Sequence, residues 1–278
     1  MKRKIVADSS ANLLTLDGVD FESAPLVIRT NDREFEDDAN LDVEAMADYL
    51  MTYKGKSGSA CPGVGDYLAA FEGYDEVFVT TIISVLSGSY NAAMLAKNQY
   101  EEENPGKRVC VLDSFSTGPE MKLIVDKYRE MILAGEDFDT IDKVIREYKA
   151  NTTATIFCLQ SMNNLANNGR VKPAVAAIAS ILGIRAIGDV DEGGLHPTDK
   201  VRGEKKAIST IFANMKKMGY KGGKLIIDHA FNKNAALALK EITIAEFPSA
   251  QVRVEETRGL CTFYAEKGGL IIGFEREL

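Results

Sequence analysis

Short apolar runs alternate with amphipathic stretches along the first 160 residues of the chain. The runs are rich in valine, isoleucine and phenylalanine, which is typical of strands buried on both faces of a parallel sheet. Stretches with apolar residues at helical spacing lie between them, for example around Met121, Ile124 and Val125. We therefore predict an α/β fold with a doubly wound parallel sheet, which binds ligands at the carboxyl ends of its strands. The predicted strands of this part are 5–7, 24–29, 77–83, 109–114 and 155–159.

The pattern changes after the last of these strands. A polar segment at 163–170 interrupts the alternation, and an alanine-rich stretch at 174–182 predicts a helix. Residues 191–194 predict a hairpin turn, and a hairpin among helices favours a mixed α+β domain. We therefore divide the chain into an N-terminal α/β domain, 1–160, and a C-terminal α+β domain, 161–278. The other elements predicted after this division are helices at 204–218 and 235–244 and strands at 225–228, 252–254 and 270–274.

The composition and net charge of the chain exclude some classes of binding partner. The chain has 278 residues, of which 45% are hydrophobic and 27% charged, as in an ordinary globular protein with a real core. Its net charge of −8 argues against nucleic-acid binding and against an anionic membrane as the main partner, which leaves only transient membrane contact. No apolar run approaches the roughly 20 residues that span a bilayer, and the run after the basic N-terminus is too short for a signal peptide.

The cysteines and histidines point to a cytoplasmic protein without a metal site. The four cysteines have no CxxC spacing, so we expect reduced thiols of the kind found in the cytoplasm. His196 and His229 are the only histidines, and neither belongs to a cluster of ligating residues. A zinc site is therefore not expected.

The candidate binding element is the turn Ser87-Gly88-Ser89. It lies between the predicted strand 77–83 and a helix predicted at 91–100. Backbone N–H groups at a helix start lack intrahelical partners and carry partial positive charge, and glycine is free to take a positive φ, so such a turn can hold an anion. The alternative is that the two serines merely cap the helix.

Seven short motifs, in order, resemble those of the DegV family over essentially the whole chain. Those bacterial proteins bind fatty acids and include the FakB subunits of fatty acid kinase. The matching segments are 5–13, 59–62, 86–93, 113–118, 168–171, 184–187 and 200–207, which contain the family-like sequences LSGSYNAA and KVRGEKKA.

The resemblance implies a non-catalytic carrier with a long-chain fatty acid in a tunnel between two domains. The fatty acid is its ligand and no other cofactor is implied. Its carboxylate is expected at Ser87, Gly88 and Ser89, with further contacts from Ser59 and Arg170. The alternative for Ser59 is a serine of a flexible loop, and the alternative for Arg170 is a solvated arginine at a helix end. A basic cluster is expected to dock a partner, a fatty acid kinase subunit, unless it is only a solvated charge run. The cluster consists of Lys200, Arg202, Lys205 and Lys206.

One departure concerns the carboxylate. Family members carry a histidine near the C-terminus that helps to hold it, and Ala265 stands at that position here. Tyr264 is adjacent, but strand neighbours point to opposite faces, so as part of a strand it is not expected to reach the pocket.

Two other function classes stay open. The fold is related to the substrate domain of dihydroxyacetone kinase, which makes a small-molecule phosphotransferase or another enzyme of that fold the alternative. The sequence contains no GxxxxGK[ST] loop and no GxSxG elbow, and Cys61 has no recognisable base beside it. A protein-interaction module without a ligand is the third class.

Overall fold

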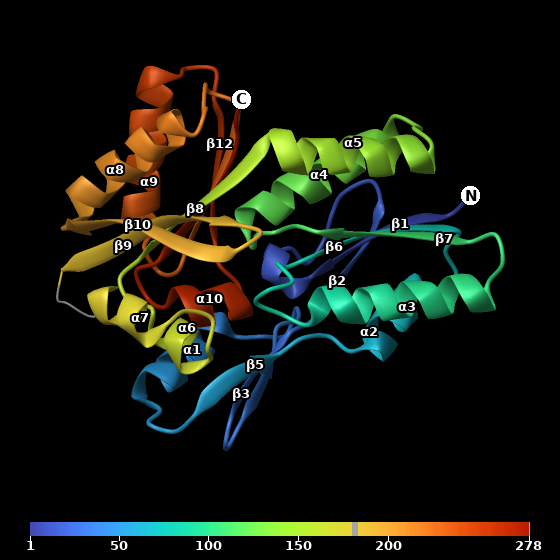
Figure 1. Cartoon of the computed structure of the whole chain (residues 1–278), viewed down its shortest axis with the longest axis horizontal. Coiled ribbons are helices and arrows are strands. Elements are labelled where there is room, and N and C mark those ends of the chain that lie inside the picture. The colour runs from blue at the N-terminus through green and yellow to red at the C-terminus, as the bar shows by residue number, and fades with distance from the viewer. Residues whose placement is uncertain (180–182, 278) are drawn as a thin grey trace.

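The computed structural model describes residues 1–179 and 183–277 and contains three β-sheets (Figure 1). The first sheet has the strand order β2-β1-β6-β7, and all of its neighbouring strands are parallel. It confirms the predicted parallel sheet of an α/β fold. Its strands are β1 (Arg3–Asp8), β2 (Asp20–Ala24), β6 (Glu76–Thr81) and β7 (Arg108–Asp113).

Helices cover both faces of this parallel sheet. Side chains alternate between the faces along each strand, so Val6 and Val79 pack against one helix pair while Ile5 and Phe78 pack against the other. This double burial explains why the middle positions of β1, β6 and β7 are consecutive apolar residues. The first pair is α2 (Val64–Phe71) and α3 (Ser89–Glu103), and the second is α4 (Pro119–Leu133) and α5 (Phe138–Asn151).

The second sheet is mixed and has the order β10-β9-β8-β13-β11-β12. Only the pair β11 and β12 is parallel. Helices α8 (Glu204–Lys217) and α9 (Lys233–Glu246) pack on one face. The strands are β8 (Thr153–Leu159), β9 (Ile184–Asp191), β10 (Gly194–Arg202), β11 (Lys224–His229), β12 (Gln251–Glu256) and β13 (Leu270–Glu275).

The apolar run at 155–159 was assigned to the wrong sheet. It forms β8, which pairs antiparallel with β9 and β13 of the second sheet and with no strand of the first. Apolar residues along a strand show that both of its faces are covered, but they do not identify the strands beside it. The division of the chain at residue 160 stays a prediction.

Helix α4 lies between the two large sheets and packs against strands of both. Met121 and Ile124 face the parallel sheet, while Leu123 contacts Ile226 on β11. The same helix also buries the charged side chains of Glu120 and Lys122 completely. The two sheets therefore share one central, buried layer.

A small third sheet, ordered β4-β3-β5, was not fully anticipated. The predicted strand at 24–29 is broken, because β2 ends at Ala24 and β3 (Val27–Thr30) begins a new sheet. The glycine-rich segment 54–63, which carries no strand pattern in the sequence, contains β5 (Ser57–Ala60), and this strand pairs with β3. The other edge strand is β4 (Glu34–Glu36), and α1 (Val43–Thr52) follows it.

The remaining predictions of the C-terminal half are largely confirmed. Asp191 pairs with Gly194 across the predicted hairpin turn. The alanine-rich helix is α7 (Pro173–Ala179), and the rest of its predicted range lies outside the described residues. None of the described helices combines the length and the apolar content that crossing a membrane requires. Three short helices complete the chain: η1 (Ser9–Ala11), α6 (Asn163–Asn167) and α10 (Gly259–Ala265).

Candidate ligand-binding site

A cavity of about 300 Å³ lies between the parallel sheet and the second sheet. Its walls come from the segments that follow β5 and β6, from the segment before α4, from strands β8, β9, β10 and β13, and from helix α10. The carboxyl ends of the parallel strands therefore border it, as expected for a ligand site in an open α/β sheet.

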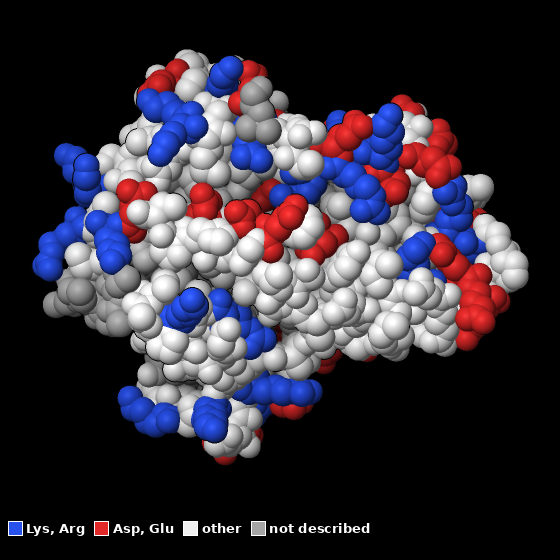
Figure 2. All heavy atoms as spheres, in the orientation of Figure 1, with Lys and Arg blue, Asp and Glu red and all other residues white. Residues whose placement is uncertain are grey.

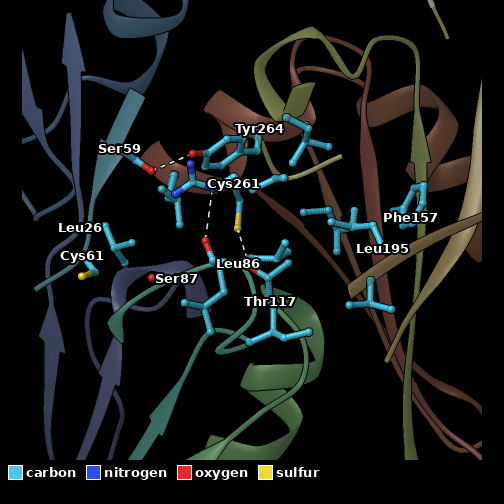
Figure 3. Close-up of a pocket in the computed structure, with 18 of the residues that line it drawn as sticks. Leu26, Ser59, Cys61, Leu86, Ser87, Thr117, Phe157, Leu195, Cys261 and Tyr264 are labelled. Atoms are coloured by element: carbon cyan, nitrogen blue, oxygen red, sulfur yellow. Dashed lines mark hydrogen bonds between the residues drawn. The ribbon is translucent and has the colours of Figure 1, made fainter. Parts of the chain in front are cut away.

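Polar and apolar side chains line opposite sides of this cavity (Figure 3). Ser59 and Ser87 lie at one side, where Tyr264 also reaches in. Phe157 and Leu195 lie at the opposite side, among aliphatic residues of the second sheet. This arrangement suits an elongated amphipathic ligand that has a polar head at one end and an apolar body.

The Ser-Gly-Ser turn lines the cavity through Ser87 and Gly88. Gly88 has φ −75° and ψ 0°, so the turn does not use the positive φ that glycine permits. Glycine is useful here because of space: a Cβ at this position would lie 3.1 Å from Sγ of Cys61. The absent side chain thus lets the turn approach the segment that follows β5.

Ser89 is turned away from the cavity, contrary to our expectation for the ligand site. It is completely buried and is not among the lining residues. Its hydroxyl donates to Oδ2 of Asp8 at 2.5 Å and lies 2.6 Å from the Tyr67 hydroxyl. Asp8 also accepts from the backbone N–H of Ile82 at 2.8 Å. Ser89 therefore fixes the turn to the end of β1.

Asp8 is the anchor of this arrangement. Burial raises the pKa of its carboxyl group, while hydrogen bonds from Ser10, Ser89 and Ile82 act in the opposite direction. The carboxyl group joins the ends of β1 and β6 to the start of α3. It therefore holds in register the segments that border the cavity.

Tyr264 reaches the cavity, and its assignment to a strand was wrong. It belongs to α10, and its hydroxyl lies 2.8 Å from the Ser59 hydroxyl, 205 residues away in sequence. The apolar residues Leu260, Phe263 and Tyr264 follow helical spacing, which is the signal that could have identified the helix.

Asp37 fixes the first turn of α10. Its buried carboxylate accepts from the backbone N–H groups of Gly259 and Leu260, both at 2.9 Å. Burial raises the pKa of this carboxyl group, and the same hydrogen bonds and the charge of Arg258 oppose the shift. A Cβ on Gly259 would lie 2.8 Å from the Asp37 side chain, so the close approach requires glycine.

Arg170 lines the cavity at its polar end. Its Nε donates to the Leu86 carbonyl at 3.2 Å, and Nη1 donates to the Asn168 carbonyl. The guanidinium lies over the Tyr264 ring, 6.0 Å from its centre. A positive charge therefore stands beside the hydroxyls of the cavity.

The thiols in the cavity show no arrangement for nucleophilic chemistry. Burial raises the pKa of Cys261 to about 12, which keeps its thiol neutral. The Cys261 Sγ lies 3.4 Å from the Thr117 hydroxyl. His196 and His229 do not line the cavity. Within 1–179 and 183–277, no group of His, Cys, Asp or Glu side chains could hold a metal ion.

The predicted basic cluster is exposed and lies away from the cavity. It occupies the end of β10 and the start of α8, where Figure 2 shows Lys and Arg side chains on the left of the molecule. Arg202 follows Leu195 along β10 by about 23 Å at 3.3 Å per residue. The cluster is therefore a surface feature, separate from the polar end of the cavity.

Comparisons with known proteins agree on one family. The family model described as "Uncharacterised protein, DegV family" matches residues 2–277. A DegV domain-containing protein of Streptococcus gordonii is 39% identical over 281 residues, which cover 99% of each chain.

Two solved structures are similar over nearly the full length. One is a DegV family protein from Eubacterium eligens loaded with heptadecanoic acid, with 41% identity, a TM-score of 0.96, and coverage of 99% of this chain and 100% of that one. The other is the Streptococcus pneumoniae fatty acid kinase B3 protein loaded with linoleic acid, with 37% identity, a TM-score of 0.97 and coverage of 100% of both chains.

Proposed function

This chain belongs to the DegV family, and from that premise we propose that it binds one long-chain fatty acid in the cavity between its two large sheets. The observation that carries the proposal is the division of the cavity, with the Ser59, Ser87 and Tyr264 hydroxyls and Arg170 at one end and mainly apolar side chains along the rest. The fatty acids in the structures of the two similar proteins support it.

The apolar part of the cavity supplies most of the binding free energy. Burial of roughly fifteen methylene groups at about 0.8 kcal/mol each gives about 12 kcal/mol before the cost of ordering the chain. The residues available for this contact include Phe157, Leu159 and Leu195.

The carboxylate is held at the polar end by Ser59, Ser87, Gly88 and Arg170 in this proposal. Hydroxyl groups and a guanidinium form charge-assisted hydrogen bonds with a carboxylate, and such bonds are stronger than neutral ones. Ser89 has an indirect role, because its hydroxyl holds the turn in place through Asp8.

We further propose that the protein is a carrier and has no turnover by itself. It would present its fatty acid to a kinase subunit that docks on the basic cluster Lys200, Arg202, Lys205 and Lys206, all of which are exposed. A cytoplasmic location is part of the proposal, and the four free cysteines support it.

The test is to identify what the purified protein carries. We expect organic extraction and mass spectrometry to recover a long-chain fatty acid in near-equal molar amount. The delipidated protein should rebind such an acid in a titration. A protein that yields no acid and does not rebind one would contradict the proposal.

The enzyme alternative is tested separately. Incubation with ATP and dihydroxyacetone should give no product above background. Turnover that disappears in a Cys61→Ala or Ser59→Ala variant would identify an enzyme and overturn the carrier assignment.

A further inference from the structure

We propose that the Tyr264 hydroxyl is a direct donor to the ligand carboxylate and forms a two-hydroxyl clamp with Ser59. This inference rests on the proposed fatty-acid function and adds a residue to its head-group site. It begins from the 2.8 Å contact between the hydroxyl oxygens of Tyr264 and Ser59 at the polar end of the cavity.

The proton count of the pair favours this role. Each hydroxyl has one proton to donate, and their mutual hydrogen bond uses one of the two protons. No other hydrogen bond of either side chain is found within the described part of the chain. The second proton is therefore available to an acceptor inside the cavity, whichever of the two oxygens carries it.

Ser87 adds a third hydroxyl at the same end. Its Oγ accepts from the backbone N–H of Ser89 at 3.3 Å, which leaves its own proton to donate. The Arg170 guanidinium stands over the Tyr264 ring, so this end of the cavity also carries a positive charge. An acceptor with two oxygens and a negative charge fits this set better than a neutral head group does.

The Tyr264 ring is held rigidly enough to place its hydroxyl. Its ring packs edge-on against Phe263 with centroids 4.7 Å apart. Asp37 fixes the first turn of α10 through two backbone N–H groups. A donor on a fixed helix loses little freedom when a ligand arrives, which favours affinity.

The experiment compares two ligands that differ only at the head. Palmitic acid and the primary alcohol of the same chain length are titrated into the delipidated protein and its Tyr264→Phe variant, which lacks only the hydroxyl oxygen. A hydrogen bond to a charged group is worth about 1.5–3 kcal/mol, so the variant should bind the acid at least about tenfold more weakly. Its affinity for the alcohol should change less than about threefold.

Tyr220→Phe is the matched control. The Tyr220 hydroxyl donates to the Gly223 carbonyl and is not among the cavity-lining residues, so its loss should leave both affinities unchanged. Equal weakening of acid and alcohol in Tyr264→Phe would show that Tyr264 only shapes the cavity, and unchanged acid affinity would show no contact. Either result overturns the clamp. A wild-type protein that binds neither ligand would instead overturn the proposed function on which the clamp rests.

Discussion

Lys122 on α4 donates to Asp228 on β11 with 2.8 Å between Nζ and Oδ1, and both side chains are completely buried. Lys122 also contacts Glu255 on β12 at 2.6 Å, and Asp228 accepts from Asn12 of the segment after β1 at 2.6 Å. A buried charge needs a partner, so these contacts join the central helix, the second sheet and the start of the chain.

Loss of Lys122 should therefore be costly. We expect Lys122→Met to lower the free energy of unfolding by about 3–5 kcal/mol, because it leaves Asp228 buried without its cation. Chemical denaturation measures the change. Lys224→Met is the control: its Nζ pairs with Glu130, whose side chain is 44% exposed, and the loss of that surface pair should cost under about 1 kcal/mol. Equal effects would show that burial of the first pair is unimportant.

The two serines of the turn should behave differently. Ser89→Ala removes a donor from buried Asp8 and should lower the free energy of unfolding by about 1–3 kcal/mol. Ser87→Ala loses only the longer, half-buried hydrogen bond from the Ser89 N–H and should lower the free energy of unfolding by less than about 1 kcal/mol, but it should weaken fatty-acid binding about tenfold or more. Denaturation and ligand titration on both variants separate the two roles. A reversed pattern would contradict the orientation of the turn.

Phe157 should limit the length of the bound chain. It lies at the side of the cavity away from Ser59, and a Cβ on Gly188 would come within 2.6 Å of its ring, so the ring lies over that glycine. Phe157→Ala should favour longer acids by about fourfold for each added methylene that becomes buried.

Competition between acids of different length measures this preference. Leu26→Ala is the control and should leave the length preference unchanged, because Leu26 lines the cavity near Cys61 on the side of the hydroxyls. Phe157→Leu provides a smaller change should the alanine variant fail to fold. An unchanged length preference in both Phe157 variants would show that the chain ends elsewhere.

His229 should make stability depend on pH. Its side chain is buried, and its Nδ1 has no hydrogen-bond partner among residues 1–179 and 183–277. Burial lowers its pKa from 6.5 despite the nearby charge of Glu256. The unfolded chain therefore binds the proton more readily than the folded protein. The stability contribution is complete above pH 6.5 and is lost as the pH falls toward the lower pKa of the folded state.

The check is a set of denaturation curves between pH 7 and 5. His229→Asn should lose stability less steeply over this range than the wild type. His196→Asn should retain the wild-type slope, since the His196 side chain is exposed and its removal uncovers no buried group. Parallel slopes for wild type and His229→Asn would assign the acid sensitivity to other groups.

Local patterns of residues were enough to predict several elements of this fold. The strands β1, β6 and β7 are apolar because both of their faces are covered, and their alternation with helices requires parallel connections. The turn at Ser87 and Gly88 was also accessible, since a strand, a small flexible segment and a helix follow one another there. These features depend on residues that are close together in the sequence, so they can be predicted without knowledge of distant contacts.

Local patterns do not show which elements lie side by side, and these neighbours became known from the folded chain. The apolar pattern of β8 fits either sheet, and its partners β9 and β13 come later in the chain. Ser89 points into the protein, where its hydroxyl donates to the buried carboxylate of Asp8. Tyr264 lies beside Ser59 because Asp37, from a distant segment, holds the start of α10 in place. The burial of polar groups forces such pairings between residues far apart in sequence, and a local pattern carries no record of the partner.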